Sequence, residues 1–86
     1  MATSIDAVDE IIRDVRGSSH QVRIARSSHL VDDLGLRSIE LIALITRSEL
    51  TFGVNLISRM DQLVNVWTIG QLLDLIDELR ATRVEA

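Results

Sequence analysis

Apolar residues recur along the chain at spacings of three and four, which place side chains on one face of an α-helix. The first such positions are Ile5, Val8, Ile12 and Val15. Acidic residues lie early and arginines late in this stretch, as the helix dipole favours. We therefore predict a helix over about residues 4–16, capped by Ser4 or Thr3 and ended by Gly17.

The most apolar stretch runs from Ser38 to Phe52 and contains no Pro or Gly that would interrupt a helix. Ser38 is of the residue type that caps a helix start, and Gly53 suits the left-handed position that closes one. We predict a helix over 38–52 whose solvated positions are Glu40, Thr46, Arg47 and Glu49. Because apolar residues cover more than half of its circumference, this helix must contact several neighbours or offer an apolar surface to a partner.

Two further helices are expected in the last third of the chain. Met60, Leu63 and Val64 predict a short helix over about 58–64 that depends on packing. A capping-box pattern at Thr68 and Gln71 precedes the last apolar stripe. The stripe consists of Ile69, Leu72, Leu73, Ile76 and Leu79. It predicts a helix over 69–81, followed by a frayed tail over 82–86.

The connection over residues 17–37 contains serine pairs and Gly35, which favour irregular structure. Its apolar residues are too many for a solvated linker: Val22, Ile24, Leu30, Val31, Leu34 and Leu36. A short strand around Val22 and Ile24 would have no partner strand, so an ordered loop across a helical core is the better interpretation. Ordered loops of this length are unusual and often functional. The predicted fold is an all-α, four-helix bundle forming one domain over 1–86.

Composition narrows the functional classes. The chain has 86 residues and no cysteine, which excludes disulfides and thiolate metal sites. A net charge of −4 argues against nucleic acid as a partner, because phosphate binding needs clustered positive charge. The N-terminal segment has no long apolar run, and no stretch approaches the roughly 18–20 apolar residues that span a bilayer. We expect a monomeric cytoplasmic protein that does not insert into membranes.

The start of the second helix carries the most suggestive chemistry. A phosphate attached to the Ser38 oxygen would meet unsatisfied N–H groups and the positive end of the helix dipole. The simpler alternative is that Ser38 only caps the helix. The segment Asp33-Leu34-Gly35-Leu36-Arg37-Ser38-Ile39-Glu40-Leu41 resembles the Asp-x-Gly-x-x-Ser motif of the acyl carrier protein family. Phe52-Gly53-Val54-Asn55-Leu56 and Trp67-Thr68-Ile69-Gly70-Gln71-Leu72 resemble the family's segments around the later helices, so the resemblance covers nearly the whole chain.

The resemblance implies a discrete carrier with the carrier-type bundle and a 4′-phosphopantetheine arm, drawn from coenzyme A, on Ser38. The arm's thiol would hold acyl groups as thioesters, so the protein itself would not be an enzyme. The implied partners are a phosphopantetheinyl transferase, an acyl-loading ligase or acyltransferase, and a ketosynthase or other synthase of a polyketide or fatty-acyl pathway. Arg37 stands where the family most often has Asp, and we hypothesise that it pairs with the arm's phosphate.

Eight residues around Ser38 are candidates for partner contacts: Asp33, Leu36, Arg37, Ile39, Glu40, Ile42, Ala43 and Arg47. The alternative for Glu40 and Arg47 is an ordinary solvated face, and for Ile42 and Ala43 it is core packing. Asp33 is expected to cap the loop or to contact a partner. Met60 and Val64 are either core residues or the border of an acyl cavity between the second and third helices.

Other functions stay open with less support. A peptidyl or aminoacyl carrier usually shows Gly-Gly-[His/Asp]-Ser, which residues 35–38 do not match. An unmodified, carrier-like interaction module would need no reactive serine. A hydrolase using Ser38 with His20 or His29 lacks the G-x-S-x-G elbow. Asp32 and Asp33 with His29 do not complete a metal-ligand set, so no metal site is expected.

Overall fold

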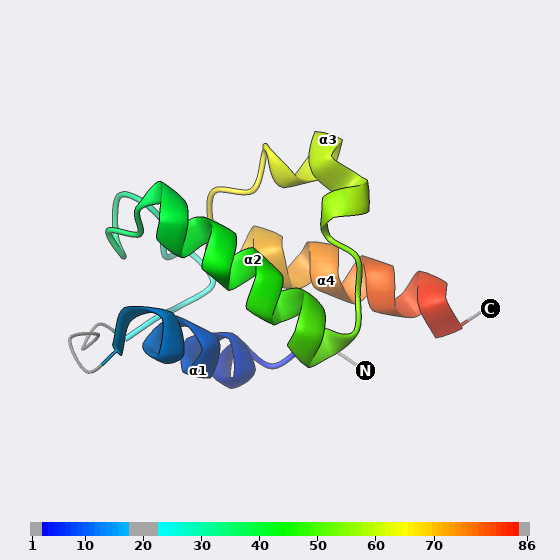
Figure 1. Ribbon diagram of the computed structural model, residues 1–86, viewed down its shortest axis with the longest axis horizontal. Helices are drawn as coiled ribbons and strands as arrows, with labels where there is room; N and C mark the ends of the chain where they lie inside the picture. Colours follow the sequence, from blue (N-terminus) through cyan, green and yellow to red (C-terminus); the bar gives the residue numbers. More distant parts are fainter. Residues whose placement is uncertain (1–2, 18–22, 85–86) are drawn as a thin grey trace.

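The computed structural model describes residues 3–17 and 23–84, and the regular secondary structure in this part of the chain is helical. The helices are α1 (Ile5–Arg16), α2 (Ser38–Phe52), α3 (Met60–Leu63) and α4 (Ile69–Val84), shown in Figure 1. A 3₁₀ turn, η2 (Ile57–Arg59), leads directly into α3. No strand occurs within the described residues, where the only β-type pairing is an isolated bridge between His29 and Thr68. The predicted all-α class is thus confirmed.

The helix boundaries follow the local signals closely at most ends. Ser4 caps α1, and its hydroxyl accepts a hydrogen bond from the Asp6 N–H at 3.1 Å. Gly53 closes α2 in the left-handed conformation. At the start of α4 the Thr68 hydroxyl accepts a bond from the Gln71 N–H, and the Gln71 side chain accepts one from the Thr68 N–H. This reciprocal pair is the predicted capping box.

Two boundaries differ from the prediction. The short third helix was expected over 58–64, but its first turn is the 3₁₀ segment η2 and α3 ends at Leu63. The tail was expected to fray from residue 82, yet α4 continues to Val84 and the Thr82 hydroxyl donates to the Glu78 carbonyl at 2.9 Å. Residues 85 and 86 lie outside the described residues.

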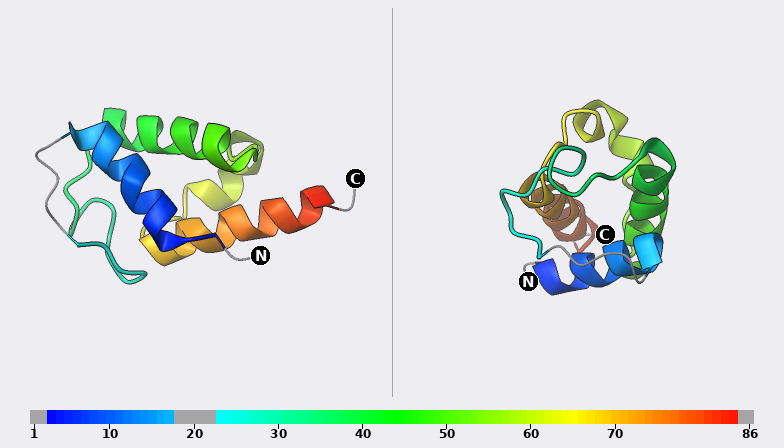
Figure 2. Two further views of the ribbon diagram at one scale, coloured as in Figure 1. Left: turned by 90° about the horizontal axis from the view of Figure 1, so that it is seen from below. Right: turned by 90° about the vertical axis from the view of Figure 1, so that its left-hand side faces the viewer.

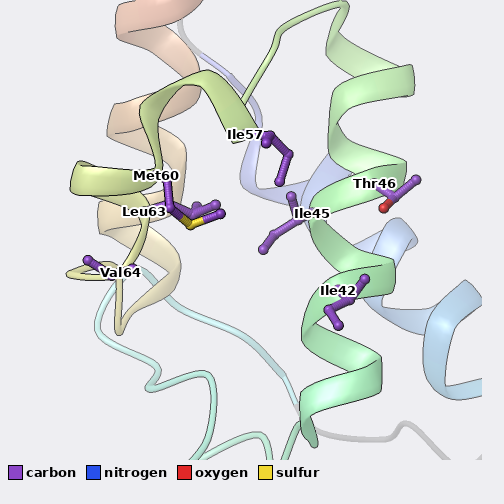
Figure 3. A pocket seen from close by; sticks show the side chains of 7 residues that line it. All are labelled: Ile42, Ile45, Thr46, Ile57, Met60, Leu63 and Val64. Atoms are coloured by element: carbon purple, nitrogen blue, oxygen red, sulfur yellow. The ribbon is translucent and has the colours of Figure 1, made fainter.

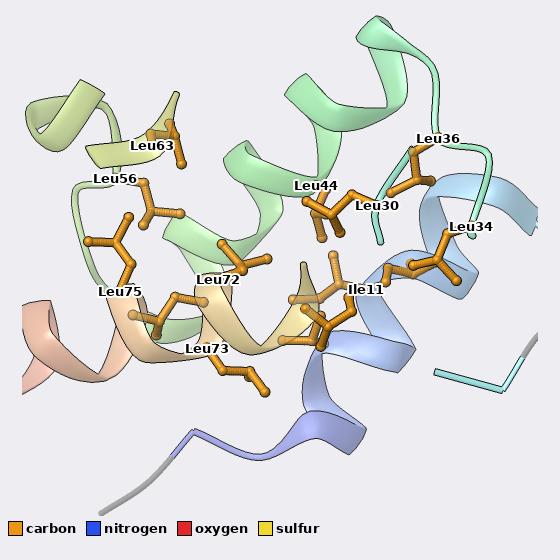
Figure 4. Close-up of a cluster of buried hydrophobic side chains, with 14 of the residues drawn as sticks. Ile11, Leu30, Leu34, Leu36, Leu44, Leu56, Leu63, Leu72, Leu73 and Leu75 are labelled. Atoms are coloured by element: carbon orange, nitrogen blue, oxygen red, sulfur yellow. The ribbon is translucent and has the colours of Figure 1, made fainter. Parts of the chain in front are cut away.

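The helices lie around a common interior, as the end-on view in Figure 2 shows, and the side chains buried there are mainly apolar. Its most completely buried apolar side chains come from three helices and from the segment before η2 (Figure 4). They are Val8, Ile12, Leu44, Leu56, Ile69, Leu72, Leu73 and Ile76. All are aliphatic, in keeping with a chain whose aromatic residues are only Phe52 and Trp67.

The described part of the connection before α2, residues 23–37, is bonded to the start of α4. The Leu30 N–H donates to the Trp67 carbonyl at 2.8 Å, and the Gly70 N–H donates to the Arg26 carbonyl at 2.8 Å. Gly70 is buried at this contact, and a Cβ there would lie 3.0 Å from the Arg26 carbonyl oxygen. The close approach of the two backbones therefore favours glycine, since a larger side chain would have to displace the loop. Val22, which suggested a short strand, lies outside the described residues.

Within the described residues, no single helix is long and apolar enough to cross a membrane. The pair formed by Ser38–Phe52 and Ile57–Leu63 meets the length and composition test together, but it is bent by 119°.

Candidate functional site

The loop before α2 places the helix start by burying its leucines. Leu34 and Leu36 are 2% and 3% exposed, while Gly35 between them has a φ of 67°. A side chain is strained at this φ, so glycine lets the chain turn between two core residues. The Asp33 carboxylate accepts a hydrogen bond from the His29 N–H at 2.7 Å. Of its two predicted roles, Asp33 therefore fills that of capping the loop.

Ser38 is not the cap of α2. Arg37 occupies the N-cap position with extended backbone, and Ser38 is the first helical residue. The Arg37 N–H is bonded instead by the Glu40 carboxylate, at 2.9 Å to Oε1. The Ser38 side chain is exposed and makes no hydrogen bond to any described residue. The interpretation of Ser38 as a capping residue is therefore wrong, and its hydroxyl has no structural role among the described residues.

Glu40 joins α1 to the start of α2. Its Oε2 lies 3.9 Å from Arg16 Nε, and its Oε1 lies 3.7 Å from Arg37 Nε. The hydrogen bond from the Arg37 N–H, followed by the charges of Arg16 and Arg37, holds the pKa of Glu40 below its ordinary value. The side chain is only 16% exposed. Glu40 was predicted to be solvated and to contact partners, but it is turned inward and supports the helix start.

Arg16 also binds the loop. Its Nη1 donates to the Leu34 carbonyl in the loop, and its Nε lies 3.9 Å from the Glu40 carboxylate in α2. One guanidinium therefore contacts the segments on both sides of Ser38. The last turn of α1 thus orients the segment that presents Ser38. No pattern in the sequence signals this role, because it depends on how α1 packs against α2.

An apolar groove lies between α2 and the segment formed by η2 and α3, with a volume of about 260 Å³. Figure 3 shows its lining side chains: Ile42, Ile45, Thr46, Ile57, Met60, Leu63 and Val64. Ile42 lies four residues after Ser38, one helical turn further along the same face. The groove therefore begins about one turn from the Ser38 hydroxyl.

Several residues expected in the core are exposed at this groove. Met60 and Val64 are 48% and 58% exposed, so of their two predicted roles the structure favours that of bordering a cavity. Ile42 is 64% exposed, and the core-packing alternative for it is wrong. Ala43 is half-buried. The groove is also lined by four residues that were not predicted as such: Ile45, Thr46, Ile57 and Leu63. The spacing of Ile57, Met60 and Val64 was the available signal for the α3 side of the groove.

The remaining candidates for partner contact divide by exposure. Ile39 is 73% exposed and the Arg37 side chain 82% exposed, so both are accessible beside Ser38. Arg47 is exposed as well and lies 3.6 Å from Asp14 of α1. Leu36 was predicted to contact partners, but its side chain lies in the core. That prediction is wrong, and Leu36 instead anchors the loop.

His29 stabilises the loop before α2. Its Nδ1 accepts hydrogen bonds from the N–H groups of Val31 and Asp32, at 3.2 and 3.0 Å, and its ring stacks on Trp67 with centroids 6.0 Å apart. A nitrogen occupied in this way is not available as a metal ligand or as a base. The described residues contain no group of three or more His, Cys, Asp or Glu side chains that could hold a metal ion. His20 lies outside the described residues.

Comparison with known proteins adds no assignment. No family model matches this chain, and no curated protein matches it either.

Proposed function

We propose that this chain is a discrete acyl carrier protein of a polyketide or fatty-acyl pathway. In this role it would hold acyl groups as thioesters on a 4′-phosphopantetheine arm attached to Ser38. The observation that carries the proposal is the Ser38 hydroxyl, which is exposed at the first position of a 15-residue helix and makes no hydrogen bond to a described residue. The motif from Asp33 to Leu41, which resembles that of carrier proteins, adds independent support.

The surroundings of Ser38 fit a phosphodiester. The N–H groups in the first turn of a helix lack intrahelical partners, and the helix dipole favours a negative charge there. The Arg37 guanidinium is 82% exposed next to Ser38 in sequence, and among described residues its ion pair is with Glu40, at 3.7 Å. A single negative charge on the Ser38 oxygen would therefore meet a positive environment. Arg37 and the first-turn N–H groups are the parts of this chain that would hold the phosphate.

The attachment step needs only a nucleophilic oxygen from this chain. A phosphopantetheinyl transferase would bring coenzyme A to Ser38, whose oxygen forms the new P–O bond as the bond to the nucleotide portion breaks. The hydroxyl proton passes to a base of the transferase, and the nucleotide leaves as adenosine bisphosphate. When bound, the arm supplies the thiol that this cysteine-free chain lacks. Everything else this chain contributes is position and recognition.

The apolar groove gives the carrier a place for an acyl chain. Its lining is almost wholly hydrocarbon, with Thr46 as the one polar side chain. Burial of apolar surface stabilises a bound chain by about 0.8 kcal/mol for each CH₂ removed from water. A chain carried on Ser38 could thus be shielded between α2 and α3 while the thioester waits for the next enzyme.

The test is the intact mass of the purified protein after incubation with coenzyme A and a broad-specificity phosphopantetheinyl transferase. We expect the wild type to gain the mass of one phosphopantetheine group and Ser38→Ala to gain none. Ser27→Ala is the matched control, because Ser27 is also exposed and has no hydrogen-bond partner among the described residues. This control should be modified like the wild type.

A folded wild type that gains no mass with two different transferases would refute the carrier proposal. The exposed apolar residues of α2 would then favour the second candidate function, a helical interaction module that is never modified.

A further inference from the structure

His29 closes a single turn of backbone that leads toward Ser38. Its Nδ1 accepts hydrogen bonds from the N–H groups of Val31 and Asp32, at 3.2 and 3.0 Å. In return the Asp33 carboxylate accepts a hydrogen bond from the His29 N–H at 2.7 Å. Side chain and backbone therefore bond each other in both directions across the turn, as in the capping box of a helix. The imidazole ring takes the place that a serine or aspartate side chain ordinarily fills at a helix start.

The capped turn is anchored in the core. The Leu34 N–H donates to the His29 carbonyl at 3.0 Å, and the Leu36 N–H donates to the Leu30 carbonyl at 3.1 Å. All three leucines belong to the cluster of buried side chains drawn in Figure 4. Ser38 follows Leu36 by two residues. A short buried segment therefore connects the His29 cap to the start of α2.

The cap depends on the protonation of the His29 ring. Because Nδ1 accepts two hydrogen bonds, these bonds assign the ring to its neutral form with the proton on Nε2. A second proton, on Nδ1, would turn this acceptor into a donor that faces two N–H groups, and both hydrogen bonds would be lost. Histidine is also the side chain whose charge ordinarily changes between about pH 5 and about pH 8.

The Asp32 carboxylate offers the protonated ring another contact. It lies 3.8 Å from the His29 Nε2 and is 79% exposed, so it is free to follow the ring. The Asp33 carboxylate, at the backbone of the same turn, also favours a positive ring. The two forms of the ring therefore have different partners. The neutral ring bonds the backbone of the turn, and the charged ring pairs with carboxylates.

The other elements packed around the ring add little charge to this balance. The ring stacks on Trp67 with centroids 6.0 Å apart, and the first turn of α4 contains no acidic residue. Asp74, in the next turn of α4, is paired with Arg26 at 2.7 Å. On the α1 side, the guanidinium of Arg16 bonds a carbonyl at the end of the turn. The contacts of the ring that depend on its proton are thus those within its own loop.

We propose that His29 is a proton-sensitive cap that regulates how the loop presents Ser38. At neutral pH the unprotonated ring holds the turn closed, and in mild acid the protonated ring releases the N–H groups of Val31 and Asp32. The turn then opens more often, and residues 34–37 hold Ser38 less firmly for the transferase. This inference deepens the proposed function and rests on it for the enzyme that acts on Ser38, whereas the opening of the turn does not depend on it.

Amide hydrogen exchange on three forms of the unmodified protein tests the cap: wild type, His29→Asn and His29→Ala. Asparagine supplies an oxygen that accepts N–H groups and does not titrate, whereas alanine supplies no acceptor. Both replacements remove the stack on Trp67, so the comparison between them isolates the cap. The readout is the protection factor of the Leu34 and Leu36 N–H groups, which bond across the turn. A protection factor already corrects for the effect of pH on the intrinsic exchange rate.

We expect the wild type to lose about threefold to tenfold in protection between about pH 7.5 and about pH 5.5. His29→Asn should stay protected at both pH values, and His29→Ala should be weakly protected at both. His20→Gln removes the only other histidine and should behave like the wild type. If the replacements at His29 do not fold, the wild type still decides, because the NMR signals of the His29 ring and of the Val31 and Asp32 N–H groups must titrate with one midpoint.

The consequence for Ser38 is measured as the rate at which a phosphopantetheinyl transferase attaches the arm. Each wild-type rate is divided by that of His29→Asn at the same pH, so that the pH dependence of the transferase cancels. We expect this ratio to fall about twofold to fivefold between about pH 7.5 and about pH 5.5, because a smaller fraction of the protein presents Ser38 correctly.

Three results would overturn the proposal: equal loss of protection in wild type and His29→Asn, titration of the ring without a change at the Val31 and Asp32 N–H groups, or a constant ratio of attachment rates. Because exchange is measured on protein without the arm, the two proposals fail separately. A protein that shows the His29-dependent loss of protection but never gains the arm retains the cap and loses the carrier function.

Discussion

Arg16 at the end of α1 and Glu40 in the first turn of α2 form the contact that joins the two helices beside Ser38, with Nε 3.9 Å from Oε2. The same carboxylate holds the Arg37 N–H at 2.9 Å, and the same guanidinium donates to the Leu34 carbonyl. Two side chains therefore connect α1, the loop and the start of α2. This arrangement keeps the Ser38 hydroxyl outside the network that positions it.

Glu40→Gln tests the electrostatic part of this contact. The pKa of Glu40 is lowered in the folded protein, so its charge stabilises the fold above the ordinary glutamate pKa of about 4.3. That stability is lost as the pH falls through the lowered folded pKa. We expect the variant to be less stable than the wild type by a constant amount above about pH 5, with the difference shrinking in acid. Urea denaturation between pH 3 and pH 7 measures it, and a difference that grows in acid would contradict the assignment.

Gly70→Ala tests the close contact between the loop and α4. The new methyl group would lie 3.0 Å from the Arg26 carbonyl oxygen, which also accepts the Gly70 N–H. Overpacking at such a contact costs about 1–3 kcal/mol, while alanine gains up to about 1 kcal/mol in helix propensity. We expect a net loss of about 1–2 kcal/mol in the free energy of unfolding. An unchanged urea midpoint would mean that the loop moves aside freely.

Ser48→Ala tests a buried hydroxyl in the middle of α2. Ser48 is 0% exposed, and its hydroxyl has no hydrogen-bond partner among the described residues. An unpaired buried hydroxyl costs about 1–3 kcal/mol, and alanine is the better helix former. We therefore expect a gain of about 0.5–1.5 kcal/mol in stability. Ser27→Ala, at an exposed loop position, serves as the control and should change stability by less than about 0.5 kcal/mol.

The groove indicates which side chains a carried acyl chain would contact. In protein that has gained the arm, loading of a medium-length acyl group should shift the methyl NMR signals of Ile45, Met60 and Leu63, which line the groove. The methyl signals of Ile5 and Ile24 should stay in place, since these residues lie at a separate, polar pocket beside α1. Shifts confined to the arm itself would show that the groove does not hold the chain.

The sequence alone determined the helices and most of their ends, because these depend on contacts within a few residues. The spacing of Ile5, Val8 and Ile12 predicts α1, and the Thr68–Gln71 pattern predicts the start of α4. Likewise Gly53 marks the close of α2. Capping and periodicity are encoded locally, so they can be read without the fold.

Only the tertiary structure decided which apolar residues of α2 are buried. Ile42 and Leu44 stand two residues apart in one apolar run, yet one is 64% exposed and the other 1% exposed. The two serines of α2 differ in exposure in the same way, because Ser38 faces solvent while Ser48 lies in the core. A helix that is apolar around most of its circumference does not itself specify its buried face. That choice depends on where the other elements of the fold pack against it, so the buried face of α2 is decided only in three dimensions.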